Sequence, residues 1–201
     1  MPQTVLHAQL RKQLHDGQVI PAHPLALLEN RTLDVQCMRA LTRYYLDSGA
    51  GGIAVGVHST QFEIREPGID LFKPVLQLVS QTVDEWVAAR QETAVLKVAG
   101  VCGDTDQASR EAAFSMETGY HACLLSLSAL KKATEKELVE HCRAVAAEAP
   151  VIGFYLQPAV GGRVLPYSFW RAFADIENVI AIKMAPFNRY QTLDVLRGVC
   201  D

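Results

Sequence analysis

A single lysine interrupts an apolar stretch near the end of the sequence. The stretch is NVIAIKMA (178–185), and Lys183 is its only charged residue. If the stretch forms a strand, Lys183 lies near its carboxyl end. A partly desolvated lysine has a lowered pKa, and its neutral amine is a nucleophile. Lys183 is therefore a candidate nucleophile. The alternative is a lysine that extends to solvent or forms a structural ion pair.

A tyrosine holds a similar place in the preceding apolar stretch, PVIGFYLQ (150–157). Tyr155 lies near the carboxyl end of this predicted strand, and a phenol beside an amine can move protons during addition to a carbonyl group. We expect neighbouring strands to bring Tyr155 next to Lys183. The alternative is a core tyrosine whose hydroxyl is hydrogen-bonded.

A second lysine, Lys97, lies in the predicted strand AVLKVAGVC (94–102). It is nearer the amino end, and in α/β barrels the active site is built at the opposite end of the strands. We therefore expect Lys97 to be an ion-paired structural residue.

Histidines suggest a different chemistry. His23 and His58 end the first two predicted strands, and Cys102 and Asp104 follow the third. Four such ligands at one mouth would suit a metal-assisted hydrolase. Their spacing matches no recognised metal motif, so we keep this as an alternative and expect no metal. Surface or helix-face positions are expected for the remaining histidines, His7, His15, His121 and His141.

The elements that position these residues follow from the apolar pattern. Short apolar runs alternate with longer amphipathic segments, which is typical of parallel βαβ units covered on both faces. Thr134 and Glu137 have the spacing of a capping box, and Gly49 and Gly119 have the place of helix ends. We expect strands at 18–24, 51–57, 94–102, 121–127, 150–157 and 178–185, and helices at 4–15, 34–47, 70–90, 105–117, 135–148, 167–175 and 188–199.

Composition excludes several classes of protein. The 201 residues are 49% hydrophobic, with net charge −3 and no long basic run, so nucleic acid is not an expected partner. No apolar stretch reaches the roughly 20 residues of a membrane span, and the opening segment does not resemble a signal peptide. We expect a cytoplasmic protein. The odd number of cysteines, five in all, favours buried thiols over a disulfide framework.

Three segments carry a family resemblance. AGVCGDTDQA, GFYLQPAVGG and NVIAIKMA resemble the third, fifth and sixth strands of the dihydrodipicolinate synthase and N-acetylneuraminate lyase family, which are class I aldolase-type (β/α)₈ TIM barrels. The family pattern Tyr–x–x–Pro–x–x–x–Gly is matched by Tyr155, Pro158 and Gly162, and its Schiff-base lysine by Lys183.

The resemblance implies a lyase or aldolase that acts on pyruvate or a related 2-oxo acid through a lysine imine, without a cofactor or metal. Lys183 would be the nucleophile and Tyr155 the proton shuttle. The loop GVHST would bind the carboxylate through Gly56, Val57, His58 and Ser59, and we place His23, Gln157 and Gly162 in the same site. The resemblance also implies a homo-oligomer and a second substrate, an unidentified aldehyde or acid.

The sequence departs from the family at several site positions. Val57 and His58 replace threonines of the carboxylate loop, Val160 replaces an arginine, and Leu130 lies where the synthases supply a tyrosine to a neighbouring subunit. Arg163 could reach the place of the missing arginine. A different acceptor is therefore expected, and a catalytically silent 2-oxo-acid-binding barrel is a second alternative.

Length bears on the same comparison. A (β/α)₈ barrel takes about 250 residues and eight strand–helix units. Residues 1–201 supply about six units, and we interpret them as a single incomplete barrel domain that is truncated after the sixth.

Overall fold

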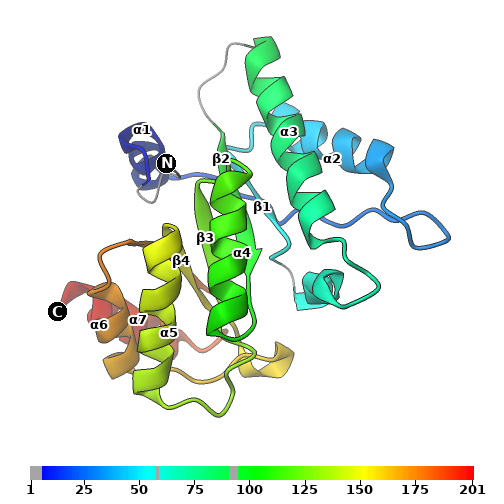
Figure 1. Ribbon diagram of the computed structural model, residues 1–201. Coiled ribbons are helices and arrows are strands. Elements are labelled where there is room, and N and C mark those ends of the chain that lie inside the picture. The colour runs from blue at the N-terminus through cyan, green and yellow to red at the C-terminus, as the bar shows by residue number, and fades with distance from the viewer. Residues whose placement is uncertain (1–5, 58, 91–94) are drawn as a thin grey trace. The chain divides into compact units, whose positions relative to one another are not determined.

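The computed structural model describes residues 6–57, 59–90 and 95–201. The chain divides into two compact units (Figure 1). The first comprises residues 6–100 and 117–121, and the second comprises residues 101–116 and 122–201.

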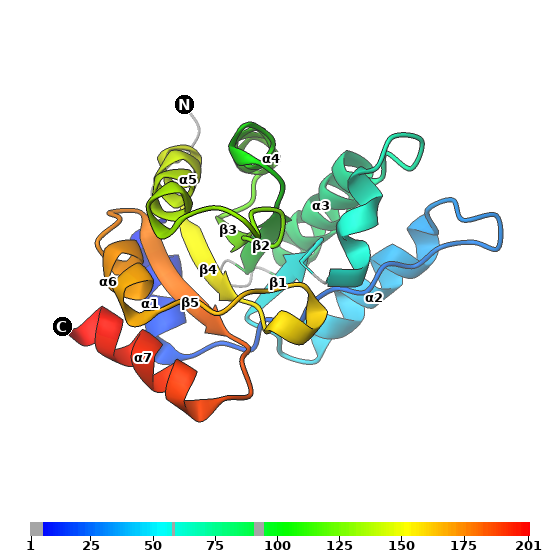
Figure 2. The ribbon, with the colours of Figure 1, turned by 90° about the horizontal axis from the view of Figure 1, so that it is seen from below.

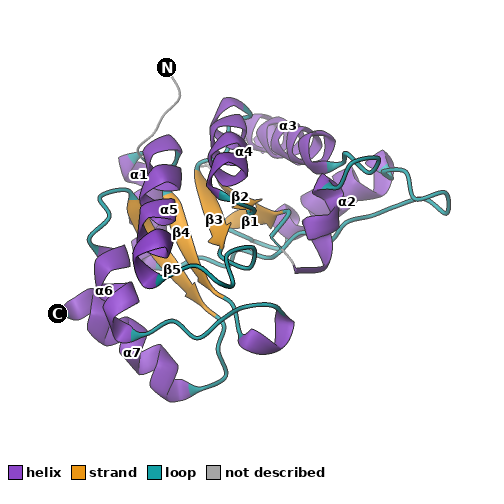
Figure 3. Cartoon of the chain, turned by 60° about the horizontal axis from the view of Figure 1, so that its bottom comes forward, coloured by secondary structure: helices purple, strands orange, loops and turns teal. Residues whose placement is uncertain are grey.

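In the first unit, two parallel strands are accompanied by helices. Strand β1 (Gly52–Val55) pairs with β2 (Leu96–Val101), and Gly52 lies opposite Leu96. Helices α2 (Val35–Asp47) and α3 (Phe72–Arg90) both contact β1, as Figure 3 shows. Helix α1 (Ala8–Asp16) precedes them, and the 3-10 helix η1 (Ser59–Arg65) follows β1. This unit carries the predicted carboxylate loop.

The segment predicted as a first strand, 18–24, runs beside β1 but forms only a single bridge, Ala22 to Ala54. The His23 amide donates to the Ala54 carbonyl at 2.8 Å, and the Ala54 amide donates to the Pro21 carbonyl at 3.0 Å. Pro21 and Pro24 lack the N–H that a longer ladder requires. The segment was predicted as a strand, and the structure forms only this bridge.

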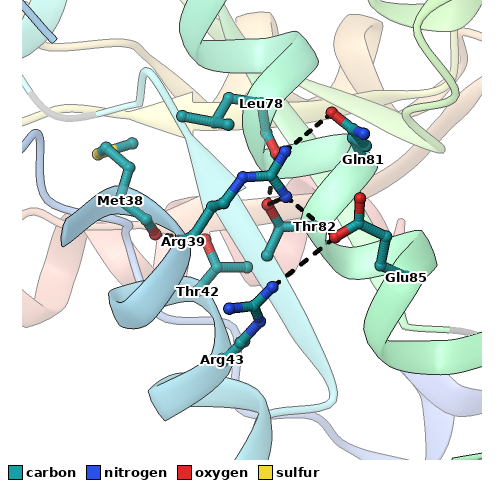
Figure 4. Close-up of polar contacts among 8 residues, drawn as sticks. All are labelled: Met38, Arg39, Thr42, Arg43, Leu78, Gln81, Thr82 and Glu85. Carbon is teal, nitrogen blue, oxygen red and sulfur yellow. Dashed lines mark hydrogen bonds and ion pairs between the residues drawn. The ribbon is translucent and has the colours of Figure 1, made fainter. Parts of the chain in front are cut away.

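Figure 4 shows how polar side chains join α2 to α3. Arg39 donates to Thr82 Oγ1 at 3.2 Å, to Glu85 Oε2 at 2.9 Å and to Gln81 Oε1 at 3.1 Å. Arg43 lies 3.7 Å from the same Glu85 oxygen. The planar guanidinium of Arg39 satisfies three acceptors at once, so it fixes the relative position of the two helices that contact β1.

The second unit is built on three parallel strands in the order β3 (Ala122–Ser126), β4 (Val151–Tyr155) and β5 (Val179–Met184). Helices α4 (Thr105–Glu117), α5 (Glu135–Glu148), α6 (Tyr167–Ala174) and α7 (Arg189–Cys200) alternate with the strands, and the 3-10 helix η2 (Pro158–Val160) follows β4. Helices α6 and α7 lie side by side (Figure 2).

The strands of this unit differ in burial. All residues of β3 and β4 are buried, whereas β5 is partly exposed and ends in the exposed Lys183 and Met184. The segment that follows β5 exposes large apolar side chains among polar ones. These are Phe187, Tyr190, Leu193, Leu196 and Val199.

Local signals fix several boundaries as predicted. The Thr134 hydroxyl accepts from the Glu137 amide, and the Glu137 carboxylate accepts from the Thr134 amide at 2.6 Å, which completes the capping box of α5. Asp104 accepts from the Gln107 amide at 2.8 Å at the start of α4. Gly49 and Gly119 have positive φ angles of 87° and 86° where their helices end.

Aromatic side chains of α6 fill the space against β4. Phe169, Trp170 and Phe173 are buried. A Cβ at Gly153 would lie 2.7 Å from the Phe173 ring, so the glycine in β4 leaves the space that this ring occupies. Three of the five cysteines, Cys102, Cys123 and Cys142, are buried as predicted. Among the described residues, no helix is both long and apolar enough to span a bilayer.

Candidate active site

Lys183 lies in β5 directly opposite Phe154 of β4. Its Nζ is 4.7 Å from the centroid of the Phe154 ring. Desolvation lowers the pKa of Lys183 from its ordinary value, although the side chain keeps access to solvent. The result is an amine that is reachable and more readily deprotonated than a free lysine, as nucleophilic chemistry requires.

Tyr155 lies on the other face of the sheet. It is opposite Met184, and its ring packs on Trp170 with centroids 4.9 Å apart. Its buried hydroxyl donates to the Leu165 carbonyl at 3.4 Å and accepts from the Leu165 amide at 3.3 Å, and burial raises its pKa. The expectation that neighbouring strands place the phenol beside the amine is therefore wrong in this structure.

The register of β4 and β5 causes this outcome. Val151 pairs with Val179, but the next residue, Ile152, pairs with Ala181, so one residue of β5 is bulged out. Side chains opposite each other in a parallel pair share a face, so Lys183 shares its face with Phe154. Sequence reasoning missed Phe154. Its position one residue before Tyr155 is a usable signal only when the bulge is known.

The loop after β4 is held by backbone and arginine contacts. Gln157 precedes η2, and its carbonyl accepts from the Gly162 amide at 3.1 Å. A Cβ at Gly162 would lie 1.8 Å from the Leu156 carbonyl oxygen, so the loop closes only with glycine there. The structure brings Gln157 and Gly162 together at the end of β4.

Arg163 binds a neighbouring loop. Its Nη1 donates to the carbonyls of Leu130, Lys131 and Ala133 at 3.0, 3.3 and 2.8 Å. This guanidinium joins the loop after β3 to the loop after β4. The suggestion that Arg163 reaches toward a substrate in place of the missing arginine gains no support, because its Nη1 is occupied by these carbonyls.

The remaining predicted site residues belong to the first unit. Gly56 has φ +66°, and Val57 is only 3% exposed. His58 lies outside the described residues, and Ser59 begins η1. Gly56 and Val57 lie directly after β1, which ends two residues earlier than the predicted strand 51–57.

His23 is buried at 2% exposure. Its Nδ1 donates to the Pro24 carbonyl at 2.7 Å, because a carbonyl can only accept. Its Nε2 is 2.9 Å from Thr42 Oγ1, and burial lowers its pKa. Both ring nitrogens are thus occupied within the first unit. This arrangement fixes the ring in the core and gives the predicted role in substrate binding no direct support.

Lys97 is an ion-paired structural residue, as predicted. Its Nζ lies 2.7 Å from Asp84 Oδ1 and 2.9 Å from Ser80 Oγ, and its side chain is 5% exposed. The Lys97 amide donates to Nδ1 of His121 at 3.0 Å. Burial and the charge of Lys97 lower the pKa of His121 to about 4, against a smaller opposing effect of Asp84.

His141 lies on a helix face, one of the two placements predicted for it, and that face is buried. It is 2% exposed on α5, and its Nδ1 is 2.9 Å from Thr105 Oγ1. Its position on a helix that faces both α4 and the sheet explains the burial. Among the described residues, no three His, Cys, Asp or Glu side chains come together in a group that could hold a metal.

The sequence model of the Dihydrodipicolinate synthetase family matches residues 16–200. The chain belongs to this family. The 4-hydroxy-tetrahydrodipicolinate synthase of Nitrosococcus oceani is 26% identical over 185 residues, which are 90% of this chain and 55% of that protein.

Solved structures of the dihydrodipicolinate synthetase family share the fold. Dihydrodipicolinate synthase from Oceanobacillus iheyensis has a TM-score of 0.74 at 19% identity, covering 94% of this chain and 60% of that one. YagE, a prophage protein of the same family from E. coli K12 in complex with pyruvate, has a TM-score of 0.76 at 18% identity, covering 90% and 59%. These matches confirm the expected fold, an α/β chain that forms part of a (β/α)₈ barrel. It spans between 55% and 60% of the length of these relatives.

Proposed function

We propose that this protein forms an imine between Lys183 and a 2-oxo acid such as pyruvate, and acts as a lyase or aldolase of the class I type. Membership of the dihydrodipicolinate synthetase family supports the reaction class. The observation that carries the proposal is the placement of Lys183: a lysine near the carboxyl end of β5, with access to solvent and a pKa lowered by desolvation.

The proposed chemistry needs only this amine and proton transfers. The neutral Nζ adds to the carbonyl carbon of the oxo acid, and the resulting carbinolamine takes up a proton and loses water to give a protonated imine. The iminium nitrogen withdraws electrons, so a proton leaves the neighbouring carbon and an enamine forms. The enamine adds to the carbonyl carbon of a second substrate, or the reverse sequence breaks that carbon–carbon bond. Hydrolysis of the imine then restores Lys183.

Tyr155 enters the proposal as the proton shuttle that the family resemblance implies. Its hydroxyl is occupied by both backbone groups of Leu165 on the opposite face, so shuttling requires these hydrogen bonds to break. Tyr155→Phe distinguishes the roles. A shuttle predicts slower imine formation at unchanged stability of the adduct, whereas a structural tyrosine predicts lower stability of the protein and an unchanged rate of trapping.

Borohydride reduction tests the proposal. The protein is incubated with pyruvate and related 2-oxo acids, reduced, digested and mapped by mass spectrometry. We expect a reduced adduct on the peptide that contains Lys183 and none in Lys183→Met. Lys97→Met is the matched control, because Lys97 is the other strand lysine and should leave the labelling unchanged. An adduct on Lys97, or no adduct with any oxo acid, overturns the proposal.

A second candidate, a barrel that binds a 2-oxo acid without turnover, is favoured by two observations. Val57 is a buried apolar residue where the family resemblance implies a threonine, and Tyr155 faces away from Lys183. Thermal stabilisation by pyruvate without a trapped adduct would support this candidate over the enzyme. The metal-assisted hydrolase that used His23 and His58 has no comparable observation in its favour.

A further inference from the structure

One row of side chains crosses the second unit on a single face of its sheet. Ser126 of β3 lies opposite Phe154 of β4, and Phe154 lies opposite Lys183 of β5. Residues in register on parallel strands are about 4.8 Å apart and project to the same side. The aromatic ring is therefore the immediate neighbour of the amine, and the distance of 4.7 Å from Nζ to the ring centroid places the nitrogen in contact with it.

The ring is well suited to hold a cation. The face of a phenylalanine ring carries negative potential, and a cation within about 6 Å of the centroid is attracted to it. Phe154 is 9% exposed and belongs to a fully buried strand, so its ring is fixed by the core. Lys183 belongs to a partly exposed strand and has a flexible stem. A fixed ring thus restricts a mobile nitrogen.

We propose that Phe154 is a positioning residue for Lys183, and that its ring holds the nitrogen in both cationic forms, the free ammonium and the iminium of the adduct. The inference deepens the proposed function and rests on it for the second form. It needs no group beyond those described, since the ring and the nitrogen are already in contact.

Charged side chains on β4, on β5 and directly after β5 do not account for the shifted pKa of Lys183. Tyr155 is the titratable residue of β4, and it packs on the opposite face. Lys183 is the only titratable residue of β5, and the first charged side chain after β5 is Arg189. The described residues give Lys183 no ion pair, and desolvation is the cause of its shifted pKa. The ring acts against that desolvation.

Two measurable effects follow from a ring that stabilises both cations. When the negative potential of the Phe154 ring is weakened, the ammonium of Lys183 loses its proton more easily, so the midpoint of its titration falls by about half a pH unit. Above the midpoint the starting amine is neutral and only the iminium loses stabilisation, so pyruvate binds about threefold more weakly. Below the midpoint the free ammonium and the iminium lose the same stabilisation, so pyruvate affinity stays constant. A purely structural residue would not produce this dependence on pH.

The experiment introduces difluorophenylalanine and pentafluorophenylalanine at position 154 of the full chain. Partial fluorination weakens the negative potential of the ring face and pentafluorination reverses it, with little change in shape. The titration of Lys183 is followed by NMR of its isotopically labelled ε-carbon, and pyruvate adducts are quantified by borohydride trapping across the same pH range. We expect a graded fall of the midpoint and a pH-dependent loss of adduct. The same substitutions at Phe169, which stacks on Phe173 in α6, should leave both unchanged.

The two readouts separate the two proposals. A Lys183 midpoint that does not move with fluorination overturns the role of Phe154, whether or not an adduct forms. A graded midpoint without any adduct supports the ring contact and overturns the imine chemistry. Phe154→Leu, which removes the ring, should also lower the midpoint, and Phe154→Tyr should match the unmodified protein.

Discussion

Lys97 and Asp84 form an ion pair whose partners differ greatly in burial, and this difference predicts an unusual pattern of stabilities. The Lys97 side chain is 5% exposed and the Asp84 side chain is 64% exposed. Asp84→Ala leaves a buried ammonium with Ser80 as its polar partner. Lys97→Met leaves a carboxylate that water already solvates, and it replaces the lysine stem with an apolar side chain of similar length.

The magnitudes follow from the desolvation of each charge. Removing one partner of a buried pair costs about 3–5 kcal/mol. Asp84 is mostly exposed, and solvent screens its attraction to Lys97, so we expect Asp84→Ala to cost about 2–3 kcal/mol. Replacing a buried charge by a well-packed apolar group is close to neutral, so we expect Lys97→Met to cost about 1 kcal/mol or less. The double variant should resemble Lys97→Met and be more stable than Asp84→Ala alone.

Denaturant unfolding of the four proteins measures these differences, and the titration of His121 by NMR reports the charges directly. The pKa of His121, about 4, should rise in Lys97→Met and fall in Asp84→Ala, because Lys97 lowers it and Asp84 raises it. Equal costs for the two single variants, or a double variant less stable than Asp84→Ala, would refute the reasoning that burial of the ammonium dominates.

Three further predictions rest on separate contacts. The pKa of His121 in the folded protein lies below the usual 6.5, so on acidification the unfolded chain binds this proton first. Denaturant unfolding should therefore show the free energy of unfolding falling by at most about 3 kcal/mol between pH 6.5 and 4. A His121→Asn variant whose stability depends on pH to the same extent would contradict this. Gly162→Ala should lower the melting temperature markedly, since its Cβ meets the Leu156 carbonyl, and an unchanged value would show that the loop relaxes. Thr134→Ala should cost about 1 kcal/mol in denaturant unfolding, whereas Glu137→Gln, which keeps an acceptor, should cost less.

Local sequence predicted the elements well where local physics decides them. Apolar periodicity and the Thr134 capping box placed α5 at residues 135–148, which the structure reproduces. Residues 18–24 have the same apolar character, but two prolines prevent a regular ladder beside β1. The prolines were visible in the sequence, but their effect depended on which residues of this segment must donate an N–H to the neighbouring strand.

The site was harder to predict because it depends on register. Lys183 was identifiable as the lone charge of an apolar stretch. Which side chain lies next to it depends on a bulge in β5, and that bulge results from the pairing of two strands that are separated by 23 residues of the chain. The alternation of side chains within each strand is a local property, but the register between two strands is not. The sequence therefore indicated Tyr155 as the neighbour of Lys183, whereas the neighbour is Phe154.

The contact of Arg163 with three carbonyls has a consequence for the motions of the chain. Residues 128–133 and 158–165 belong to different loops, yet one guanidinium holds both. Opening either loop by itself would leave the arginine or the carbonyls without partners, so we expect them to open together. Amide hydrogen exchange in the two loops should then proceed with a common opening free energy, and Arg163→Lys should uncouple them by removing the planar set of donors.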